Sequence, residues 1–486
     1  MDDKLPDDPP EQQDREQPQN WRVPHLVVND LHSQLNPTRV HAIATPASID
    51  ELRAVVLGAR ARKRAISIAG GRHSMGGQQF GTGTVLIDLR GLQRVSAFDA
   101  ERGLVTVEGG IQWPELLAFL ARAQRGRSRP WGIYQKQTGA DRLTIAGALS
   151  CNAHGRGLTL PPIVGQVESF TLMTGSGGEI TCSRTCHPEL FALAIGGYGL
   201  FGVITRVTLR LQPALKLKRV VTIVETPELM AHLADRVRSG FRYGDFQFAI
   251  DDRDATFLRR GVCSCYEPVD PGTPATSDPV RFSDDEWASL IVDAHRDKRR
   301  AFERFAARYL ATSGQIYGSD EQLSAAYTDN YHAGVDRALG CPVRGSEMIT
   351  ELYVPRDRFE PFMACAREVL RSRRANVIYG TVRLIERDTE TVLAWARERW
   401  ACIVLNLHVD HTPDGVKTAA GTFRALIDAA NGFGGSYYLA YHRWANRNQI
   451  RRSHPRMAEF MEAKRRCDPE ERFQSDWYRW HRDMLA

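Results

Sequence analysis

The stretch AISIAGGRHSMGG at residues 65–77 decides the fold. The apolar run AISIA is typical of a buried strand, and a loop in which four glycines surround one histidine follows it. Because glycine has no Cβ, backbone N–H groups of such a loop can approach a phosphate closely. The loop is therefore the first candidate for a ligand site. The alternative is a plain glycine-rich hairpin that leaves His73 exposed.

Two familiar phosphate-binding loops do not fit this stretch. The P-loop pattern requires a lysine after its last glycine, and here Gly77 is followed by Gln78. The dinucleotide fingerprint requires a helix directly after the loop, whereas the following residues QQFGTGTV lack a helical pattern. The loop must therefore serve another kind of phosphate site, or none.

Two further glycine-rich segments lie in the same half of the chain, at residues 137–170 and 194–211. Small residues at these positions permit close packing against a flat ring system and a pyrophosphate. Three such segments together predict a large, extended ligand that carries both phosphates and rings. A dinucleotide such as FAD fits this expectation better than a mononucleotide.

The elements around these segments predict a mixed α+β region over residues 37–213. Ser48 and Glu51 resemble a capping box at the start of a helix, and Pro114 suits the first turn of another. The segment ESFTLMTGSGGEITC predicts a hairpin of two strands. Further strands are expected at residues 85–89, 104–110 and 202–213.

The second half of the chain has a different character. After an exposed loop at residues 268–279, an apolar stripe from Trp287 to Tyr309 predicts one long amphipathic helix. Alternating patterns then predict a second α+β domain. Its expected strands are at residues 348–355, 377–385 and 401–409, and its expected helices at residues 361–372 and 389–400.

Composition limits the partners and the compartment. The chain has 486 residues, with 64 basic and 58 acidic side chains, and no dense basic run. We therefore expect two or three domains of roughly 150 residues and no nucleic-acid partner. No apolar stretch reaches the about 18 residues of a membrane helix. The acidic, Pro- and Gln-rich start predicts a disordered tail and no signal peptide.

The cysteines favour a reduced, cytoplasmic protein. There are nine of them, an odd number without a regular framework. The pair Cys263 and Cys265 lacks a second pair at the spacing of a zinc site. The sequence therefore predicts no metal site.

Taken together, the three glycine segments resemble the vanillyl-alcohol oxidase superfamily, with its FAD-binding domain of the p-cresol methylhydroxylase (PCMH) type. The resemblance covers nearly the whole chain and is strongest over residues 38–212 and 455–479. It implies an α+β fold with a two-subdomain PCMH-type FAD-binding domain and an α+β substrate (cap) domain whose sheet covers the flavin. The expected order is a tail and lead-in at 1–36, the FAD domain at 37–213, the cap domain at 214–430, and a C-terminal segment at 431–486 that completes the active site and returns to the FAD domain.

The resemblance also implies the cofactor site. The loop around the pyrophosphate would be formed by Ala69, Gly70, Gly71, Arg72, His73, Ser74, Met75, Gly76 and Gln78. The segment along the pyrophosphate and the flavin ring would contribute Gly139, Thr144, Gly147, Ser150, Asn152, His154 and Gly155, and the adenine end would contact Gly202, Val203 and Ile204. For His154, a structural hydrogen bond to the backbone is the alternative.

Arg72-His73-Ser74 is similar to the loop of alditol and aldonolactone oxidases, in which a histidine bonds covalently to the 8α-methyl group of the flavin. The resemblance therefore implies covalent FAD through His73. The alternatives are a loop histidine that forms no covalent bond and a metal ligand. Cys151 lies near the same place, but the local pattern does not match that of relatives with a second covalent bond.

The implied function is an FAD-dependent oxidoreductase that oxidises a CH–OH group of a polyol, sugar, aldonolactone or sugar derivative by hydride transfer to flavin N5. Oxygen or another acceptor would reoxidise the flavin. The region YYLAYHRWANRN at 437–448 lacks the His-Trp-Gly-Lys stretch of the lactone oxidases, so their substrate does not transfer. Alternatives are a non-covalent FAD enzyme acting on a lipid-linked sugar, and an FAD-binding protein without turnover.

Candidate catalytic side chains come from the expected strands of the second domain. In IVLNLHVD, Asn406 and His408 alternate with apolar residues, and Arg383 shares a strand face with Thr381. Solvated strand edges and a surface salt bridge of Arg383 are the alternatives. Near the C-terminus, Tyr441 and His442 would point to opposite faces of a strand. At most one of these two should therefore meet the flavin as a base, with Tyr441 preferred by position; a buried structural aromatic is the alternative for either.

Overall fold

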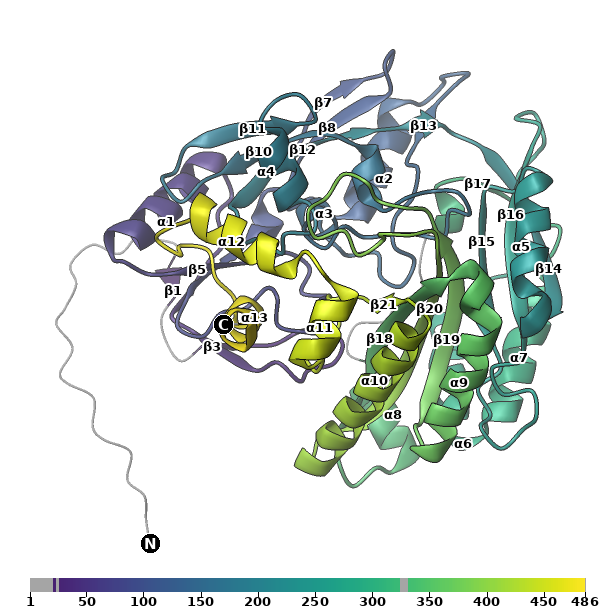
Figure 1. Ribbon diagram of the computed structural model, residues 1–486. Coiled ribbons are helices and arrows are strands. Elements are labelled where there is room, and N and C mark those ends of the chain that lie inside the picture. The colour runs from purple at the N-terminus through teal and green to yellow at the C-terminus, as the bar shows by residue number, and fades with distance from the viewer. Residues whose placement is uncertain (1–20, 23–25, 324–330, 486) are drawn as a thin grey trace, which may run out of the picture.

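A computed structural model describes residues 21–22, 26–323 and 331–485, and it confirms the predicted α+β class. Two sheets form the first part of the chain (Figure 1). One has the order β1-β4-β6-β5, in which β4 and β5 run parallel to β6 and β1 antiparallel to β4. Its strands are β1 (Trp21–Arg22), β4 (Ala42–Ala44), β5 (Ile66–Ala69) and β6 (Val85–Asp88).

The second sheet is antiparallel and follows the order β11-β10-β12-β8-β7. Its strands are β7 (Val95–Asp99), β8 (Leu104–Glu108), β10 (Val167–Met173), β11 (Glu179–Ser183) and β12 (Val203–Arg210). The predicted hairpin is confirmed by the pairing of β10 with β11. Two small sheets join β2 (Leu26–Val28) to β3 (Thr38–Val40), and β9 (Trp131–Gly132) to β13 (Gln212–Pro213).

The first helix of this part begins at the predicted cap. In α1 (Ile49–Ala61), Ser48 Oγ accepts the Glu51 amide at 3.2 Å, and Leu52 and Val56 are fully buried. Burial of each such side chain contributes about 1.5–3 kcal/mol relative to exposure. The remaining helices are α2 (Trp113–Ala123), with proline in its first turn, α3 (Ile145–Ser150) and α4 (Pro188–Ala194).

An eight-stranded sheet dominates the second part, in the order β17-β14-β16-β15-β19-β20-β18-β21. Its strands are β14 (Lys216–Glu225), β15 (Tyr243–Phe248), β16 (Arg260–Val269), β17 (Ile316–Gly318), β18 (Gly345–Pro355), β19 (Val377–Ile385), β20 (Trp400–Asp410) and β21 (Ser436–Tyr437). The helices α9 (Phe359–Ser372) and α10 (Pro413–Gly432) pack on one face, as Figure 1 shows, together with α5 (Leu229–Arg238) near the other end.

The predicted long helix over residues 287–309 is wrong in one respect, because it is broken into two. The helices α6 (Asp284–Arg296) and α7 (Lys298–Leu310) are separated by Asp297, whose side chain accepts the Arg300 amide at 3.0 Å and so starts the second helix. The apolar stripe then folds back on itself, since Phe282, just before α6, stacks on Phe305 and packs at a tilt against Tyr309. A short helix, α8 (His332–Leu339), follows.

The helix predicted at residues 389–400 is also wrong. This stretch is a loop that ends where β20 begins. The Asp388 carboxylate accepts the backbone amides of Glu390 and Thr391, and the buried Trp395 donates its indole N–H to the carbonyl of Asn152. Bonds to the first part of the chain thus replace the helical ladder that local propensity favours.

The C-terminal helices return to the first part of the chain, where Figure 1 shows them in yellow beside the purple N-terminal elements. They are α11 (Arg447–Ser453), α12 (Met457–Cys467) and α13 (Asp476–Leu485). Phe473, between the last two, forms a parallel bridge with Ile66 in β5. The strand that leads into the glycine loop is therefore held by residues more than 400 positions away.

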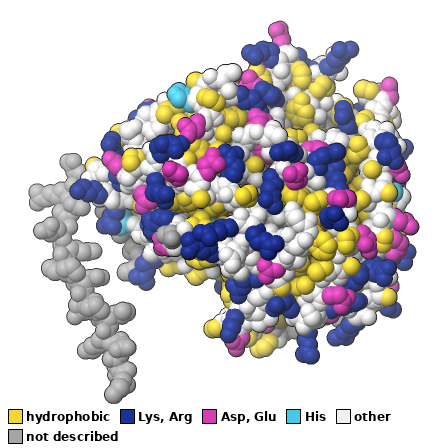
Figure 2. All heavy atoms as spheres, viewed as in Figure 1, with side chains coloured by type: hydrophobic (Ala, Val, Ile, Leu, Met, Phe, Trp, Pro, Cys, Tyr) yellow, Lys and Arg dark blue, Asp and Glu magenta, His cyan; other side chains and the backbone are white. Residues whose placement is uncertain are grey.

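The expected N-terminal tail falls largely on residues 1–20 and 23–25, which lie outside the described part. Over the described residues, no helix combines the length and the apolar character needed to cross a membrane. On the face seen in Figure 2, Lys and Arg side chains are interspersed with Asp and Glu, in agreement with the modest net charge of +6.

Candidate active site

A cavity of about 930 Å³ lies between the glycine segments of the first part and the eight-stranded sheet of the second. Its size and its mixed apolar and polar lining are typical of a site for a cofactor or small molecule. One wall is the loop at residues 70–75 with Gln78 and Gln79, and another is formed by residues of β18, β19 and β20. The C-terminal segment closes it with Tyr438, Ala440 and Tyr441.

The glycine loop is held from both ends of the chain. Arg72 adopts a left-handed backbone conformation (φ +60°), and its carbonyl accepts the amide of Leu31 at 3.1 Å. The Asn36 side chain donates to the Met75 carbonyl at 2.5 Å, and the Met75 amide donates to Ala440 O at 3.1 Å. Such a fixed loop is preorganised for a ligand, since little entropy remains to be lost on binding.

The first loop glycines are required by close contacts. A Cβ on Gly70 would lie 2.1 Å from Oγ1 of Thr144, and one on Gly71 would lie 2.2 Å from the carbonyl of Arg142. At Gly139, by contrast, a Cβ would meet nothing within 4 Å, because this residue borders open space in the cavity. The three segments therefore approach each other closely and leave an extended cradle, which fits a dinucleotide.

Most of the predicted cofactor residues line this one cavity. They are Gly70, Gly71, Arg72, His73, Ser74, Met75, Gln78, Gly139, Thr144, Gly147, Ser150, His154, Gly202 and Ile204. The structure thus brings together three segments that are distant in sequence. Their contact with FAD stays a prediction, because it rests on the shape of the cavity alone.

Five predicted cofactor residues lie outside the lining and support it instead. Ala69 and Val203 are buried in strands, and the Cβ of a larger residue at Gly76 or Gly155 would strike Gln78 or the Lys136 carbonyl. Asn152 is fully buried and donates to Asp388 Oδ2 at 2.8 Å, so it fastens the loop after β19.

His73 stands beside a second histidine that the sequence analysis did not single out. Nδ1 of His73 lies 2.8 Å from Nε2 of His32, and both rings line the cavity. Burial, together with the positive charges of His73 and His332, holds the pKa of His32 well below its usual value. At neutral pH His32 is therefore an uncharged partner for His73.

The opposite wall presents polar groups from two neighbouring strands. Thr381 and Arg383 of β19 and Asn406 of β20 line the cavity, as the predicted alternation requires. Arg383 Nη2 donates to Thr138 Oγ1 at 2.8 Å. Arg383 Nε, Thr381 Oγ1 and Asn406 Oδ1 are buried and have no hydrogen-bond partner among the described residues. Unsatisfied buried polar atoms are costly, so these three point to a polar ligand.

Two predicted catalytic histidines do not reach the cavity. His442 is 2% exposed and packs against Phe423, Tyr437 and Trp444, and burial lowers its pKa to about 3. It is therefore uncharged at neutral pH and enclosed by aromatic rings, away from the residues that line the cavity. His408 lies two residues beyond Asn406 on β20. Its Nδ1 is 3.3 Å from Oε1 of Glu347 on the neighbouring strand β18.

Tyr441 lines the cavity, but it does not have the character of a base. The segment around it is a turn rather than a strand, since β21 ends at Tyr437. Burial and the charge of Glu351 raise the pKa of Tyr441 well above its usual value, although Arg383 acts in the opposite direction. Tyr441 therefore keeps its proton and serves as a hydrogen-bond donor.

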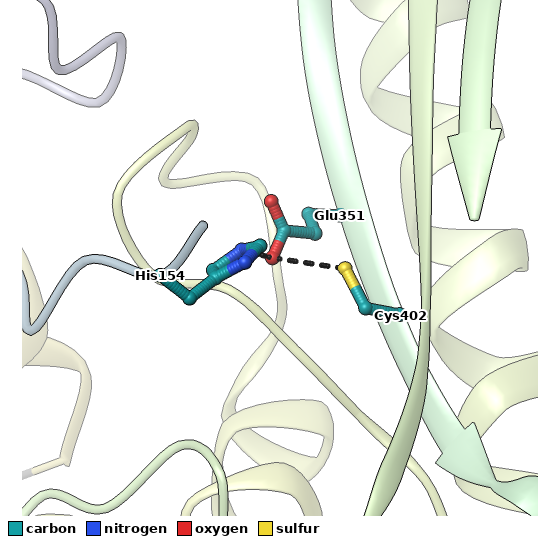
Figure 3. Close-up of side chains that lie close together, drawn as sticks. All are labelled: His154, Glu351 and Cys402. Atoms are coloured by element: carbon teal, nitrogen blue, oxygen red, sulfur yellow. Dashed lines mark hydrogen bonds and ion pairs between the residues drawn. The ribbon is translucent and has the colours of Figure 1, made fainter. Parts of the chain in front are cut away.

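A buried carboxylate that sequence analysis missed lies at the centre of the site. Glu351 Oε1 is 2.7 Å from His154 Nε2, and it accepts hydrogen bonds from Tyr353 at 2.5 Å and Cys402 at 3.4 Å. In Figure 3 the drawn contacts converge on this one oxygen, while the other carboxylate oxygen points away from them. Both Glu351 and His154 line the cavity.

The charge of Glu351 follows from these contacts. Burial raises its pKa, but the positive charge of His154, the hydrogen bonds from His154 and Tyr353, and the charge of Arg383 together hold the pKa below its usual value. Glu351 is therefore a carboxylate at neutral pH. Cys151, by contrast, has its pKa raised to about 11 by burial and remains a thiol, which makes it a poor partner for a second flavin bond.

A scan against known families matches residues 40–183 to the FAD binding domain family. Among curated proteins, the L-gulono-1,4-lactone dehydrogenase of Mycobacterium tuberculosis is 25% identical over 446 residues, covering 90% of this chain and 95% of that protein. These matches agree with the geometry of the glycine segments. They confirm the flavoprotein resemblance predicted from the sequence.

Two plant relatives match less than half of this chain. Cytokinin dehydrogenase 6 of Oryza sativa subsp. japonica is 33% identical over 235 residues, 44% of this chain and 42% of that protein. The mitochondrial L-galactono-1,4-lactone dehydrogenase of Arabidopsis thaliana is 31% identical over 190 residues, 38% of this chain and 30% of that protein. The match thus spans less than half the length of either plant protein.

Proposed function

Since residues 40–183 of this chain form an FAD binding domain, we propose that the protein is an FAD-dependent dehydrogenase or oxidase that acts on a CH–OH group. The proposed substrates are aldonolactones, sugars and polyols. The Mycobacterium tuberculosis relative, which matches 90% of this chain, is named for a lactone substrate, and this supports the choice. When bound, FAD supplies the acceptor for the hydride that leaves the substrate carbon.

One observation carries the proposal. Arg383 Nε, Thr381 Oγ1 and Asn406 Oδ1 face the cavity without hydrogen-bond partners among the described residues. A substrate with several hydroxyl groups satisfies such a set, because each hydroxyl both donates and accepts. The two donors would bind substrate oxygens, and Asn406 Oδ1 would accept from a hydroxyl. An apolar substrate would leave all three atoms unsatisfied.

The proton of the oxidised hydroxyl needs an acceptor in the same cavity. We assign it to the carboxylate of Glu351, which is ionised and lines the cavity. His154 positions this carboxylate, because its Nε2 lies 2.7 Å from Glu351 Oε1 and its Nδ1 lies 3.1 Å from the Gly155 carbonyl. A carboxylate within hydrogen-bond reach of the hydroxyl can act as a general base. Tyr441, which keeps its proton, would donate to the substrate oxygen and orient it.

We also propose that FAD is bound covalently through His73, and that the oxidant which regenerates the flavin is oxygen or another small acceptor. Support for the covalent bond comes from the place of His73 in the cavity wall and from its neutral partner His32. A covalent bond at the ring makes the flavin a better hydride acceptor and fixes it against the substrate.

The test is reduction of the purified holoprotein without oxygen. The flavin spectrum is recorded while aldonolactones, aldoses and alditols are added one at a time, with matched deoxy compounds as controls. Bleaching by at least one hydroxylated compound, and slower bleaching by its deoxy analogue, is the expected result. A flavin that stays oxidised with every compound, while dithionite reduces it, would contradict the proposal.

A second candidate substrate is a sugar derivative that carries an apolar group. The cavity continues beneath α6 and α7, where aromatic and aliphatic side chains line it: Phe282, Trp287, Leu290, Ile291, Phe302 and Phe305. If this part holds an apolar group, alkyl glycosides will reduce the flavin faster than the free sugar, and the rate will rise with chain length. Equal rates would favour the free sugar or lactone.

A further inference from the structure

A second buried carboxylate lies on the same strand as Glu351, at the other end of the cavity. Glu347 precedes Glu351 by four residues on β18, so both side chains point to the same face of the sheet. At the rise of a strand, the two positions are about 13 Å apart. Glu347 therefore belongs to a separate group of side chains, away from the proposed proton acceptor.

Three histidines from three different elements converge on Glu347. His295 Nε2 of α6 is 3.1 Å from Glu347 Oε1, and His408 Nδ1 of β20 is 3.3 Å from the same oxygen. His332 Nδ1, at the start of α8, is 2.6 Å from Glu347 Oε2. The ligand atoms of His295, Glu347 and His408 all lie within 4.8 Å of one another.

The cluster is shielded from water. Glu347 is 2% exposed, and the side chain of His295 is 6% exposed. Glu347 Oε2 has separate partners, because it accepts from the Tyr331 hydroxyl at 2.6 Å and lies 2.6 Å from His332 Nδ1. The other oxygen, with His295 and His408, therefore forms the set of atoms that can share one ion.

The surroundings of His408 provide an independent observation. Its other ring nitrogen, Nε2, lies 3.4 Å from the carboxylate of Asp410, so the ring is placed between two carboxylates. Metal-binding histidines commonly have a carboxylate on the second nitrogen, which fixes the ring and its tautomer. The ring also needs the space beside Gly345, where a Cβ would lie 2.2 Å from His408 Cε1.

We propose that His295, His408 and Glu347 bind one divalent transition-metal ion of the zinc type. Two imidazoles and one carboxylate favour such an ion over Ca²⁺ or Mg²⁺, which prefer oxygen ligands. Bonds of about 2.1 Å in a tetrahedral site place neighbouring donors about 3.4 Å apart, close to the 3.1 Å and 3.3 Å from the two histidines to Glu347 Oε1. Water would complete the tetrahedron, and the ion would fasten α6 to the sheet.

The experiment uses the full-length holoprotein without an affinity tag, purified from medium supplemented with Zn²⁺. Elemental analysis should give about one zinc ion per chain, the stoichiometry of a structural site. After removal of the metal by a chelator, titration with Co²⁺ should produce the visible bands of a tetrahedral ion, at wavelengths beyond the flavin absorption. Neither readout depends on whether the protein oxidises any alcohol.

Variants test the ligands. Glu347→Gln and His408→Asn should each lose most of the bound zinc and the Co²⁺ bands, while flavin content reports on folding. His411→Asn is the matched control, since His411 lies nearby, 2.8 Å from Ser346 Oγ, but outside the cluster; it should keep the metal. If the variants do not fold, anomalous scattering at the zinc edge from crystals of the natural protein gives the answer. Natural protein that binds neither Zn²⁺ nor Co²⁺, or full zinc content in His408→Asn, would overturn the proposal.

Discussion

His32 Nε2 lies 2.8 Å from His73 Nδ1, so a residue from the lead-in of the chain contacts the histidine of the glycine loop. If His73 carries the flavin, acid precipitation of the natural protein should leave the yellow colour in the pellet. The variant His73→Ala should release it to the supernatant. His154→Gln changes the other candidate flavin histidine and should keep the colour in the pellet. Colour that remains in the pellet of His73→Ala would place the attachment elsewhere.

Gly70→Ala should weaken FAD binding by at least about tenfold, because its Cβ would overlap the Thr144 hydroxyl at 2.1 Å and displace the loop. That hydroxyl accepts the Gly147 amide at 3.1 Å and starts α3, so the disturbance reaches two of the three glycine segments. Flavin content and thermal unfolding measure the effect. Gly432→Ala is the control, since a Cβ there meets nothing within 4 Å; a similar loss in both variants would refute the explanation.

Arg383→Ala should lower the second-order rate constant for flavin reduction by the substrate roughly 10- to 100-fold. This is the usual effect of losing a charged hydrogen bond. Arg383→Lys should recover little of this, since a lysine cannot reproduce the planar fork that now reaches Thr138. Stopped-flow reduction without oxygen gives the rates, with flavin content as the control for folding. Unchanged rates in Arg383→Ala would remove this residue from the substrate site.

Tyr441 and His442 should respond in opposite ways. Tyr441→Phe keeps the ring and removes the hydroxyl, so the rate of flavin reduction should fall while the melting temperature stays nearly constant. His442→Gln should leave the rate unchanged but destabilise the protein by about 1–3 kcal/mol, because it disturbs a buried aromatic cluster. The reverse pattern in stopped-flow and thermal unfolding would mean that His442 faces the flavin.

Asp320 should make the protein less stable as the pH rises. Burial raises its pKa from 3.8 to about 7, although a hydrogen bond from the Ile133 amide opposes the shift. Because the pKa is higher in the folded state, the stabilising effect is complete below about pH 4 and is lost as the pH rises through about 7. Asp320→Asn should therefore raise the free energy of unfolding, by up to about 4 kcal/mol above pH 7 and hardly at all near pH 4.

Urea unfolding at several pH values measures this difference. The matched control is Asp357→Asn, which makes the same change at an exposed carboxylate. A constant difference between Asp320→Asn and the natural protein from pH 4 to 8 would contradict the assignment.

The glycine-loop side of the cavity could be predicted from sequence because its signals are local. Glycine at 70 and 71 follows directly on the strand pattern of residues 65–69, and the alternation in β19 and β20 identified Arg383 and Asn406. The predictions of one long helix over residues 287–309 and of a helix at residues 389–400 were wrong. In each case an aspartate side chain, Asp297 or Asp388, accepts hydrogen bonds from backbone amides and interrupts the helical pattern.

Glu351 and Glu347 were not predicted, because their role depends on pairing between distant strands. The pattern of residues 348–355 predicted a strand, and in it Glu351 alternates with apolar residues, as any half-buried strand residue does. Only the register of β18 with β20, which places Glu347 opposite His408 and Glu351 opposite Val404, decides what each carboxylate meets. The proposed metal ligands come from three elements, so no spacing in the sequence brings them together.

The support of the glycine loop from residues 31–36 has a practical consequence for anyone who shortens this protein. The family match begins at residue 40, which invites a truncated FAD domain that starts there. Such a fragment would lack the Leu31 amide that binds Arg72 and the Asn36 side chain that binds Met75, as well as His32. A minimal flavin-binding fragment should therefore begin before β2, ahead of residue 40, where the family match begins.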